Sequence, residues 1–184
     1  FEINKGDCVA LIGPNGAGKT VLMSCILGDK KPSSGQVLID GKAGKAKNKI
    51  AVLLQENTIP NSLKVEELIA FFQSISDNPL TNQEVQELLQ FKEDQYQQFA
   101  DKLSGGQRRL LAFVLCLIDK PKILFLDEPT AGMDTSTRQR FWEIVNDLKR
   151  AGTTILYSSH YIEEVEHTAD RILVLHQGKL IRDT

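Results

Sequence analysis

The sequence predicts an α/β fold in which helices flank a mostly parallel sheet. Short apolar runs of strand length alternate with segments of helical periodicity along most of the chain, an order typical of parallel sheets. A glycine-rich turn at residues 13–20 separates one such strand from the helix that follows it, as in a phosphate-binding loop. Residues 56–102 break the alternation, because they have helical periodicity and no strand signal. We therefore expect a helical subdomain inserted into the sheet domain.

The length of 184 residues fits a single domain. We place the helical subdomain at about residues 56–118, and the nucleotide-binding core at residues 1–55 and 119–184. The chain opens at Phe1 inside what reads as a strand. We therefore expect the native N-terminal segment of the domain to lie upstream of Phe1.

Composition disfavours direct contact with nucleic acid and direct insertion into a membrane. A net charge of -2 and a pI near 6.0 argue against bulk electrostatic attraction to nucleic acid. The longest apolar run, residues 110–118, is far shorter than the roughly 20 residues that span a bilayer, so membrane association would need a partner. Cys8, Cys25 and Cys116 lie in apolar segments without metal-ligand spacing, and we expect buried, reduced thiols.

The glycine-rich turn predicts a site for nucleotide phosphates. A strand over residues 8–12 precedes it and a helix over residues 21–27 follows it. Its glycines let successive N–H groups turn into one concavity, to which the helix N-terminus adds partial positive charge. Lys19 would reach the β- and γ-phosphates, and the Thr20 hydroxyl would complete a Mg²⁺ shell. The expected nucleotide-binding residues are Gly13, Pro14, Asn15, Gly16, Ala17, Gly18, Lys19, Thr20 and Val21.

The other elements continue the alternation. The expected strands are residues 1–3, 36–40, 50–54, 122–126, 154–157, 171–175 and 179–181, the last two joined by a hairpin turn at Gln177-Gly178. The expected helices are residues 65–75, 83–91, 108–118, 137–150 and 161–167. The lysine-rich segment 42–49 has no interleaved aromatic residues, which favours a solvated loop over a nucleic-acid patch.

A Leu-Ser-Gly-Gly-Gln motif at residues 103–107 opens the helix over residues 108–118. Ser104 is the expected N-cap of that helix. Glycines are unfavourable inside helices, so a plain cap leaves Gly105 and Gly106 unexplained. A hydroxyl, two unhindered N–H groups and a helix N-terminus together favour an anion site.

Asp127 and Glu128 follow an apolar strand, at the sheet edge where α/β proteins place ligands. An aspartate there can hold Mg²⁺ through water, and a glutamate beside it can accept a proton from an attacking water. Neighbouring residues on a strand point to opposite faces, so we expect two different roles for this pair rather than two equivalent metal ligands.

Taken in order, the motifs of this chain resemble those of ATP-binding-cassette (ABC) ATPases over nearly its whole length. They are residues 13–20, Gln55, residues 103–107, residues 123–128, Ala131-Gly132-Met133-Asp134 and His160. The Leu-Ser-Gly-Gly-Gln motif discriminates, since kinases, GTPases and helicases share the phosphate loop alone. The resemblance implies the fold of a P-loop NTPase.

The resemblance also implies a role for each motif. Glu128, His160 and Gln55 are similar to the general base, the switch histidine near the γ-phosphate and the lever glutamine. The metal site would comprise Thr20, Gln55 and Asp127. Asp134 resembles the aspartate whose loop crosses the dimer seam. The signature that covers the γ-phosphate bound by the other subunit would be Leu103, Ser104, Gly105, Gly106 and Gln107.

Two departures from the family pattern limit the resemblance. Family members usually have a second hydroxyl residue after the Thr20 position; Val21 keeps the backbone N–H but lacks that hydroxyl. The aromatic residue on which the family stacks adenine would precede Phe1.

The resemblance implies a subunit that binds Mg-ATP in a head-to-tail homodimer or heterodimer and hydrolyses it. It would drive transmembrane permease subunits, and so lie in the cytoplasm at the inner face of the cell membrane. The features most resemble the ATPases of bacterial drug and antibiotic exporters. The alternative is a soluble cassette ATPase acting on nucleic acid or ribosomes. No coiled-coil heptads separate Lys19 from Asp127, and no second cassette or basic linker is visible, so we expect no nucleic-acid partner.

Overall fold

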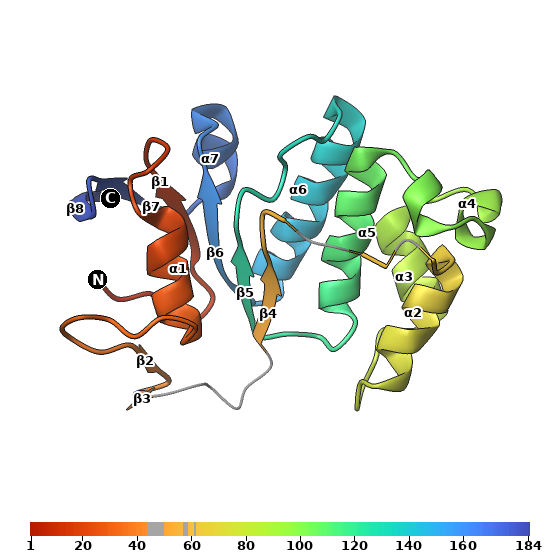
Figure 1. Cartoon of the computed structure of the whole chain (residues 1–184), viewed down its shortest axis with the longest axis horizontal. Coiled ribbons are helices and arrows are strands. Elements are labelled where there is room, and N and C mark those ends of the chain that lie inside the picture. The colour runs from red at the N-terminus through yellow and green to blue at the C-terminus, as the bar shows by residue number, and fades with distance from the viewer. Residues whose placement is uncertain (44–49, 57–58, 61) are drawn as a thin grey trace.

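The computed structural model describes residues 1–43, 50–56, 59–60 and 62–184, and its main element is a six-stranded sheet (Figure 1). In spatial order the strands are β4 (Ile50–Leu53), β5 (Ile123–Leu126), β6 (Thr154–Ser159), β1 (Cys8–Ile12), β7 (Arg171–His176) and β8 (Lys179–Asp183). The pairs from β4 to β7 are parallel, and β8 runs antiparallel to β7. The predicted α/β fold with a mostly parallel sheet is therefore confirmed.

Helices cover both faces of this sheet. Helix α1 (Lys19–Leu27) lies on one face. Helices α5 (Gly105–Leu117), α6 (Thr135–Arg150) and α7 (Ile162–Thr168) lie on the other (Figure 1). This two-sided cover is the arrangement that parallel strands with helical crossovers require.

Side-chain alternation along the strands divides the core between these two faces. On β1, Val9 and Leu11 join a cluster with Met23 of α1, whereas Cys8 and Ala10 join the larger cluster under α5 and α6. The α5–α6 contact is aromatic, with ring centroids of Phe113 and Phe141 4.3 Å apart. Strand β1 therefore buries both of its faces, as its uninterrupted apolar sequence predicts.

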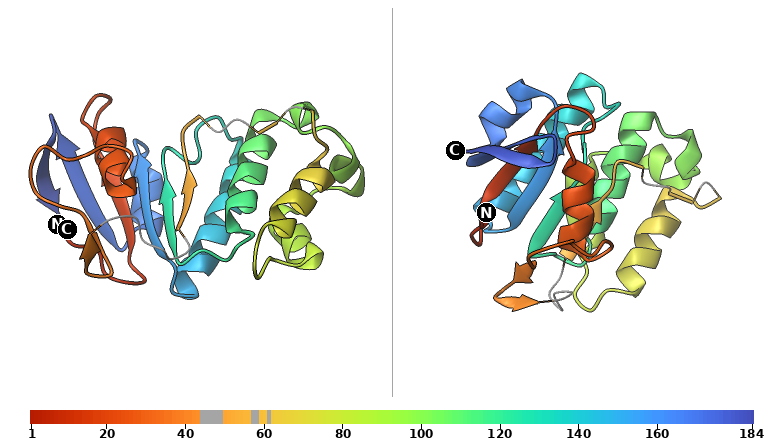
Figure 2. Two further views of the ribbon diagram at one scale, coloured as in Figure 1. Left: turned by 60° about the horizontal axis from the view of Figure 1, so that its bottom comes forward. Right: turned by 60° about the vertical axis from the view of Figure 1, so that its left-hand side comes forward.

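The remaining helices lie beyond β4, to one side of the sheet (Figures 1 and 2). They are α2 (Val65–Ser74), α3 (Asn82–Leu89), α4 (Glu93–Gln97) and the short 3₁₀ helix η1 (Ala100–Lys102). Sequence periodicity missed α4 and η1, because each is too short to show a repeating apolar pattern. Leu68 and Val85 belong to the same apolar cluster as Leu124 of the sheet, so these helices share one continuous core with it.

Two expected elements near the N-terminus need correction. Residues 1–3 form no strand; the Glu2 carbonyl accepts a hydrogen bond from the Arg171 side chain instead of joining a ladder. The expected strand 36–40 shortens to β2 (Leu38–Ile39), which turns at Asp40 and Gly41 into β3 (Lys42–Ala43). The expected loop 42–49 therefore begins as a strand, and its residues 44–49 lie outside the described part of the chain.

Other boundaries move by a few residues. Helix α1 begins at Lys19, two residues before the predicted start, and α6 begins at Thr135. Strand β6 extends to Ser159, so the serines before His160 belong to the sheet. Within the described part of the chain, none of the helices has the length and apolar character needed to cross a bilayer.

Candidate nucleotide-binding and catalytic site

The phosphate loop connects β1 to α1, and its glycines serve two different purposes. Gly16 and Gly18 have φ angles of +79° and +104°, in the left-handed region that favours glycine. Gly13 has no such φ, but a Cβ added there would lie 2.2 Å from the Leu175 carbonyl oxygen of β7. The loop is thus bent by two of its glycines and packed against the sheet by the third.

Lys19 starts α1 and lies folded into the loop. Only 7% of the residue is exposed, and its Nζ donates to the Gly13 carbonyl at 2.7 Å. The same Nζ lies 3.8 Å from Oε1 of Glu128. The ammonium group of Lys19 is therefore held between the phosphate loop and the Glu128 carboxylate, which follows β5.

Thr20 and Asp127 meet although 107 positions separate them in the sequence. The Thr20 hydroxyl donates to Oδ2 of Asp127 at 3.1 Å. Two oxygen donors at one point suit a hard cation such as Mg²⁺, which keeps water and substrate phosphate oxygens as its other ligands. No cluster of three or more His, Cys, Asp or Glu side chains that could hold a metal occurs among the described residues.

Glu128 and His160 form the second close contact at this edge. The His160 Nδ1 and Glu128 Oε2 atoms lie 2.6 Å apart, within hydrogen-bond distance. Glu128 is 9% exposed and has a φ of +46°, which is unusual for a residue with a side chain. The structure thus brings Lys19, Glu128 and His160 together.

Gln55 lies two residues after the end of β4, and its side chain is exposed. Its backbone carbonyl accepts a hydrogen bond from Nη1 of Arg109 at 3.0 Å. The structure therefore places Gln55 at the same sheet edge as Asp127, next to β5. Val21, at the position where a second hydroxyl was expected, is 51% exposed on the first turn of α1.

Arg109 is a residue that the motif analysis missed. It is 9% exposed, and its guanidinium donates to the carbonyls of two separate segments: Leu54, Gln55, Asp127, Glu128 and Pro129. Burial lowers the pKa of this guanidinium, and the nearby Asp127 carboxylate acts in the opposite direction. The available signal was its place directly before the apolar run 110–118, where a buried charge needs partners. Arg109 therefore ties α5 to the segments that carry Gln55 and Glu128.

The signature motif begins α5, and Ser104 caps it as expected. The Ser104 hydroxyl accepts from the Gln107 N–H at 3.2 Å, and Oε1 of Gln107 accepts from the Ser104 N–H at 3.1 Å. A Cβ on Gly106 would lie 3.1 Å from Oδ2 of Asp134 and 3.3 Å from Cα of Met133. Gly105 is exposed, and a Cβ there would meet nothing within 4 Å. Packing inside the chain therefore explains the glycine at position 106 but not the one at position 105.

Asp134 caps α6. Its Oδ1 accepts from the Thr137 N–H at 3.0 Å, and its Oδ2 accepts from the Thr137 hydroxyl at 2.7 Å. These hydrogen bonds hold the pKa of the Asp134 carboxyl below its usual range. The sequence allowed a cap and a role in a dimer; the cap is present.

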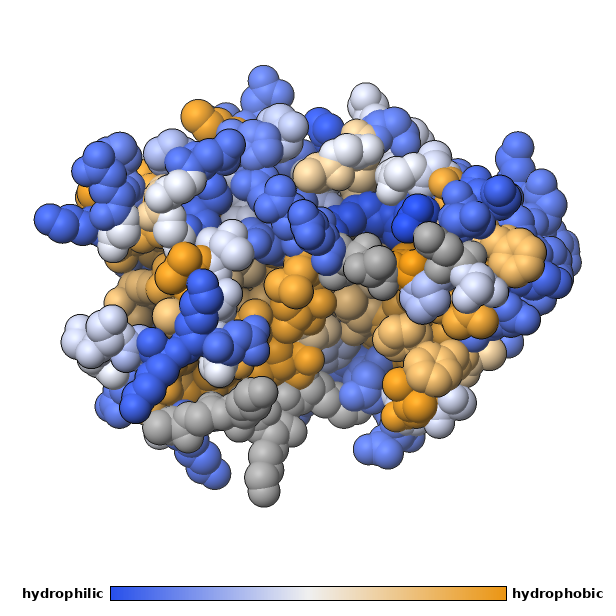
Figure 3. Space-filling model, in the orientation of Figure 1, coloured by the Kyte–Doolittle hydropathy of each residue, from blue (hydrophilic) through white to orange (hydrophobic). Residues whose placement is uncertain are grey.

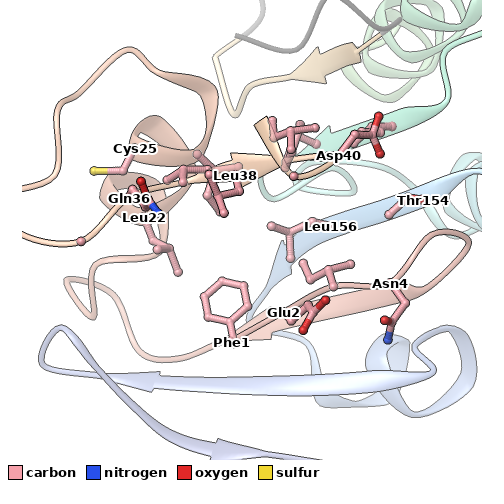
Figure 4. A pocket seen from close by; sticks show the side chains of 18 of the residues that line it. Phe1, Glu2, Asn4, Leu22, Cys25, Gln36, Leu38, Asp40, Thr154 and Leu156 are labelled. Atoms are coloured by element: carbon pink, nitrogen blue, oxygen red, sulfur yellow. The ribbon is translucent and has the colours of Figure 1, made fainter. Parts of the chain in front are cut away.

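A cavity lies apart from this edge. Its volume is about 970 Å³, and it lies on the α1 side of the sheet, lined by residues such as Phe1, Leu22, Leu38 and Leu156 (Figure 4). Figure 3 shows apolar side chains gathered between α1 and β4 on this side. The lining contains none of the predicted site residues.

The three cysteines are free, but their surroundings differ from the expectation. Cys8 is buried, and burial raises the pKa of its thiol to about 12. Cys116 is half-buried, and burial raises its pKa to about 11. Cys25 is also half-buried and lines the cavity on the α1 side. Only Cys8 is thus fully buried.

Comparison with known proteins agrees with this geometry. The family model described as "ABC transporter" matches residues 1–131. The chain is 34% identical over 192 residues to the linearmycin resistance ATP-binding protein LnrL of Bacillus subtilis, covering 98% of this chain and 61% of that protein. It is 33% identical over 192 residues to the Nod factor export ATP-binding protein I of Burkholderia lata, covering 100% of this chain and 63% of that protein.

A solved structure of an ATP-binding subunit of an ABC transporter superposes with a TM-score of 0.85 at 26% identity, covering 100% of this chain and 80% of that one. This chain spans about three fifths of the length of the two curated relatives, at 61% and 63%. The family model covers residues 1–131 of the 184, which is more than half of the chain. The chain therefore belongs to the ABC transporter family.

Proposed function

We propose that this chain is the ATP-binding and ATP-hydrolysing part of an ABC export system. One observation carries the proposal: a cation, a hydroxyl, two carboxylates and an imidazole converge at one edge of the sheet. Lys19 lies 3.8 Å from Glu128, Thr20 lies 3.1 Å from Asp127, and His160 lies 2.6 Å from Glu128. These are the groups that phosphoryl transfer to water requires.

Each side chain has a distinct task in this proposal. Lys19 and the N–H groups of the phosphate loop bind the phosphates of ATP. Thr20, Gln55 and Asp127 hold Mg²⁺, which when bound neutralises phosphate charge. Glu128 accepts the proton of the attacking water, and His160 orients its carboxylate through the contact between Nδ1 and Oε2.

We place the signature motif on the ATP of a second subunit, which makes a head-to-tail homodimer or heterodimer. The phosphate loop and the start of α5 lie at the same edge of the sheet but apart, with strands between them (Figures 1 and 2). Ser104 and Gly105 are exposed, and nothing in the chain packs where a Gly105 side chain would be. An exposed helix N-terminus with an uncrowded glycine suits an anion carried by another molecule. In the closed dimer, Asp134 would lie near the seam.

The partner in this proposal is a transmembrane permease, which would hold the chain at the inner face of the cell membrane. The names of two relatives, a resistance protein and an export protein, favour export. Leu54, Phe71 and Ile75 are exposed, and Figure 3 shows apolar side chains over α2. Leu54 is next to Gln55, so a partner docked on this surface would lie beside the metal site.

The test uses the full-length protein, purified under mild conditions that retain membrane partners. We expect a polytopic membrane protein to co-purify and Mg²⁺-dependent ATP hydrolysis to be present. Lys19→Ala should abolish hydrolysis, whereas Lys5→Ala, at an exposed lysine in the turn before β1, should not. Absence of hydrolysis in the unaltered complex would overturn the proposal, and co-purification of nucleic acid in place of a membrane protein would favour the soluble cassette ATPase.

A further inference from the structure

Ser158 is a fully buried serine near the end of β6 that none of the motifs includes. It is 0% exposed. Leu126 pairs with Tyr157 in the parallel register of β5 and β6, so Ser158 lies beside Asp127 in the next row. Leu156 and Phe125 belong to the cluster on the α1 face, and alternation places Ser158 and Asp127 on that same face.

The Ser158 hydroxyl holds both acidic residues at once. It donates to Oδ1 of Asp127 at 2.5 Å and accepts from the backbone N–H of Glu128 at 2.8 Å. A hydroxyl has one proton to donate and two lone pairs, so a single Oγ can satisfy both partners. Alanine at this position would leave a buried N–H and a buried carboxylate oxygen each without this partner.

Ser158 and Thr20 together fix the orientation of the Asp127 carboxylate. Thr20 donates to Oδ2 at 3.1 Å, and Ser158 donates to Oδ1, so each carboxylate oxygen is held by a different donor. The residue is 3% exposed, which leaves little water to replace either donor. Rotation of the carboxylate would break one of the two bonds.

For Glu128, Ser158 anchors an unfavourable backbone conformation. Its φ of +46° is rarely adopted by residues with a side chain, and such conformations persist only where the surroundings hold them. The amide of Glu128 is bound by Ser158, and its carbonyl accepts from Nη2 of Arg109 at 3.3 Å. This turn is what aims the Glu128 carboxylate at Lys19 and His160.

We propose that Ser158 is a positioning residue that sets the metal-binding orientation of Asp127 and the aim of the Glu128 carboxylate through one hydroxyl. The reaction it serves is the ATP hydrolysis under "Proposed function". The inference rests on that proposal where it is tested by turnover. Its effect on Mg²⁺-assisted nucleotide binding does not require turnover.

The experiment compares Ser158→Ala with Ser158→Thr and Ser158→Cys in the full-length complex. Loss of an orienting hydrogen bond beside a metal site typically costs about 10- to 100-fold, and we expect Ser158→Ala to lower kcat by about that factor with a smaller change in KM. Threonine should restore most of the rate, because it retains the hydroxyl. Cysteine, a weak donor of similar shape, should be intermediate.

A second readout does not depend on hydrolysis. The affinity for a non-hydrolysable ATP analogue is measured by calorimetry with Mg²⁺ and with a chelator. Ser158→Ala should lose most of the affinity gained from Mg²⁺, while binding in chelator stays near that of the unaltered protein. This pattern separates a positioning role from general destabilisation, which would weaken both.

Ser76 provides a matched control, because its hydroxyl donates to Oδ1 of Asp119 at the same 2.5 Å, away from the sheet edge. Ser76→Ala should leave kcat and the Mg²⁺ response unchanged. Equal effects of the two alanine variants, or an unchanged kcat and Mg²⁺ response in Ser158→Ala, would overturn the inference. Should Ser158→Ala not fold, the same two measurements on Ser158→Cys decide. If the unaltered complex does not hydrolyse ATP, the proposed function fails, and the Mg²⁺ dependence of binding still tests Ser158.

Discussion

The phosphate loop and the signature motif are both glycine-containing helix starts at one edge of the sheet, yet the chain treats them differently. Around the loop, side chains from α1, from the turn after β5 and from the end of β6 and the residue after it contact one another: Lys19, Thr20, Asp127, Glu128, Ser158 and His160. At the signature, Ser104 and Gln107 bond to each other, and Gly105 is open. One region is assembled within the chain, and the other presents exposed donors. This difference is what a site shared between two subunits requires.

The largest effect is expected when the proposed general base of the assembled region, Glu128, is replaced. Glu128→Gln should lower hydrolysis by about 10²- to 10⁴-fold, because the amide can hydrogen-bond but cannot accept a proton. Nucleotide binding should persist, and an ATP-bound dimer should accumulate on a sizing column. Hydrolysis near the native rate would assign the base elsewhere, with His160 as the next candidate.

The second prediction concerns one substitution in each region, tested first separately and then together in a heterodimer. Homodimers of Lys19→Ala and of Ser104→Arg should both be inactive, because the first loses phosphate binding and the second blocks closure of the signature. A forced heterodimer of the two concentrates both lesions in one site and leaves the other intact, so at most about half of the native hydrolysis should return. A heterodimer as inactive as its parents would place the whole site in one chain.

The third prediction concerns Arg109, which joins the two regions through α5. Arg109→Met leaves five carbonyls without their buried donor, and we expect a loss of about 3 kcal/mol in the free energy of unfolding. Lysine keeps the charge but not the planar fork, so Arg109→Lys should lose about half as much.

Urea unfolding of the purified chain measures these changes. Arg150→Met is the control: its partner Asp147 is a surface contact, and the loss there should stay below about 1 kcal/mol. A smaller loss at Arg109 than at Arg150 would show that the link contributes little to stability.

The smallest effect is expected at Asp134, beside the signature. Hydrogen bonds from Thr137 lower the pKa of its carboxyl in the folded chain, so its contribution to stability is present above the unfolded pKa of about 3.9 and is lost as the pH falls through the folded value. Asp134→Ala should therefore destabilise the chain at neutral pH, with a difference that shrinks in acid. Thermal unfolding of both forms between pH 3 and 7, a range of about four units around that value, measures this. A difference that grows toward acid pH would contradict the assignment.

Local patterns made much of this predictable from the sequence. The phosphate loop, the Ser104 cap and the apolar strand before Asp127 depend on neighbouring residues, and the structure has all three. Arg109 and Ser158 were missed because their partners come from other elements, and only the sheet register brings Ser158 beside Asp127. The strand over residues 1–3 was wrong for the opposite reason: a short apolar run matches the strand pattern, but a strand also needs a partner.

Strand order has a consequence for how the chain acquires its site. Strand β1 lies between β6 and β7, and Cys8 pairs with Ile155 while Val9 pairs with Arg171. Contacts this distant in sequence form late, since a long loop must close before they contribute. A nascent chain therefore carries the phosphate loop before it can fix that loop in place, which requires β6 and β7 to have left the ribosome. Nucleotide bound at this loop would report that β6 and β7 have been made and have paired with β1.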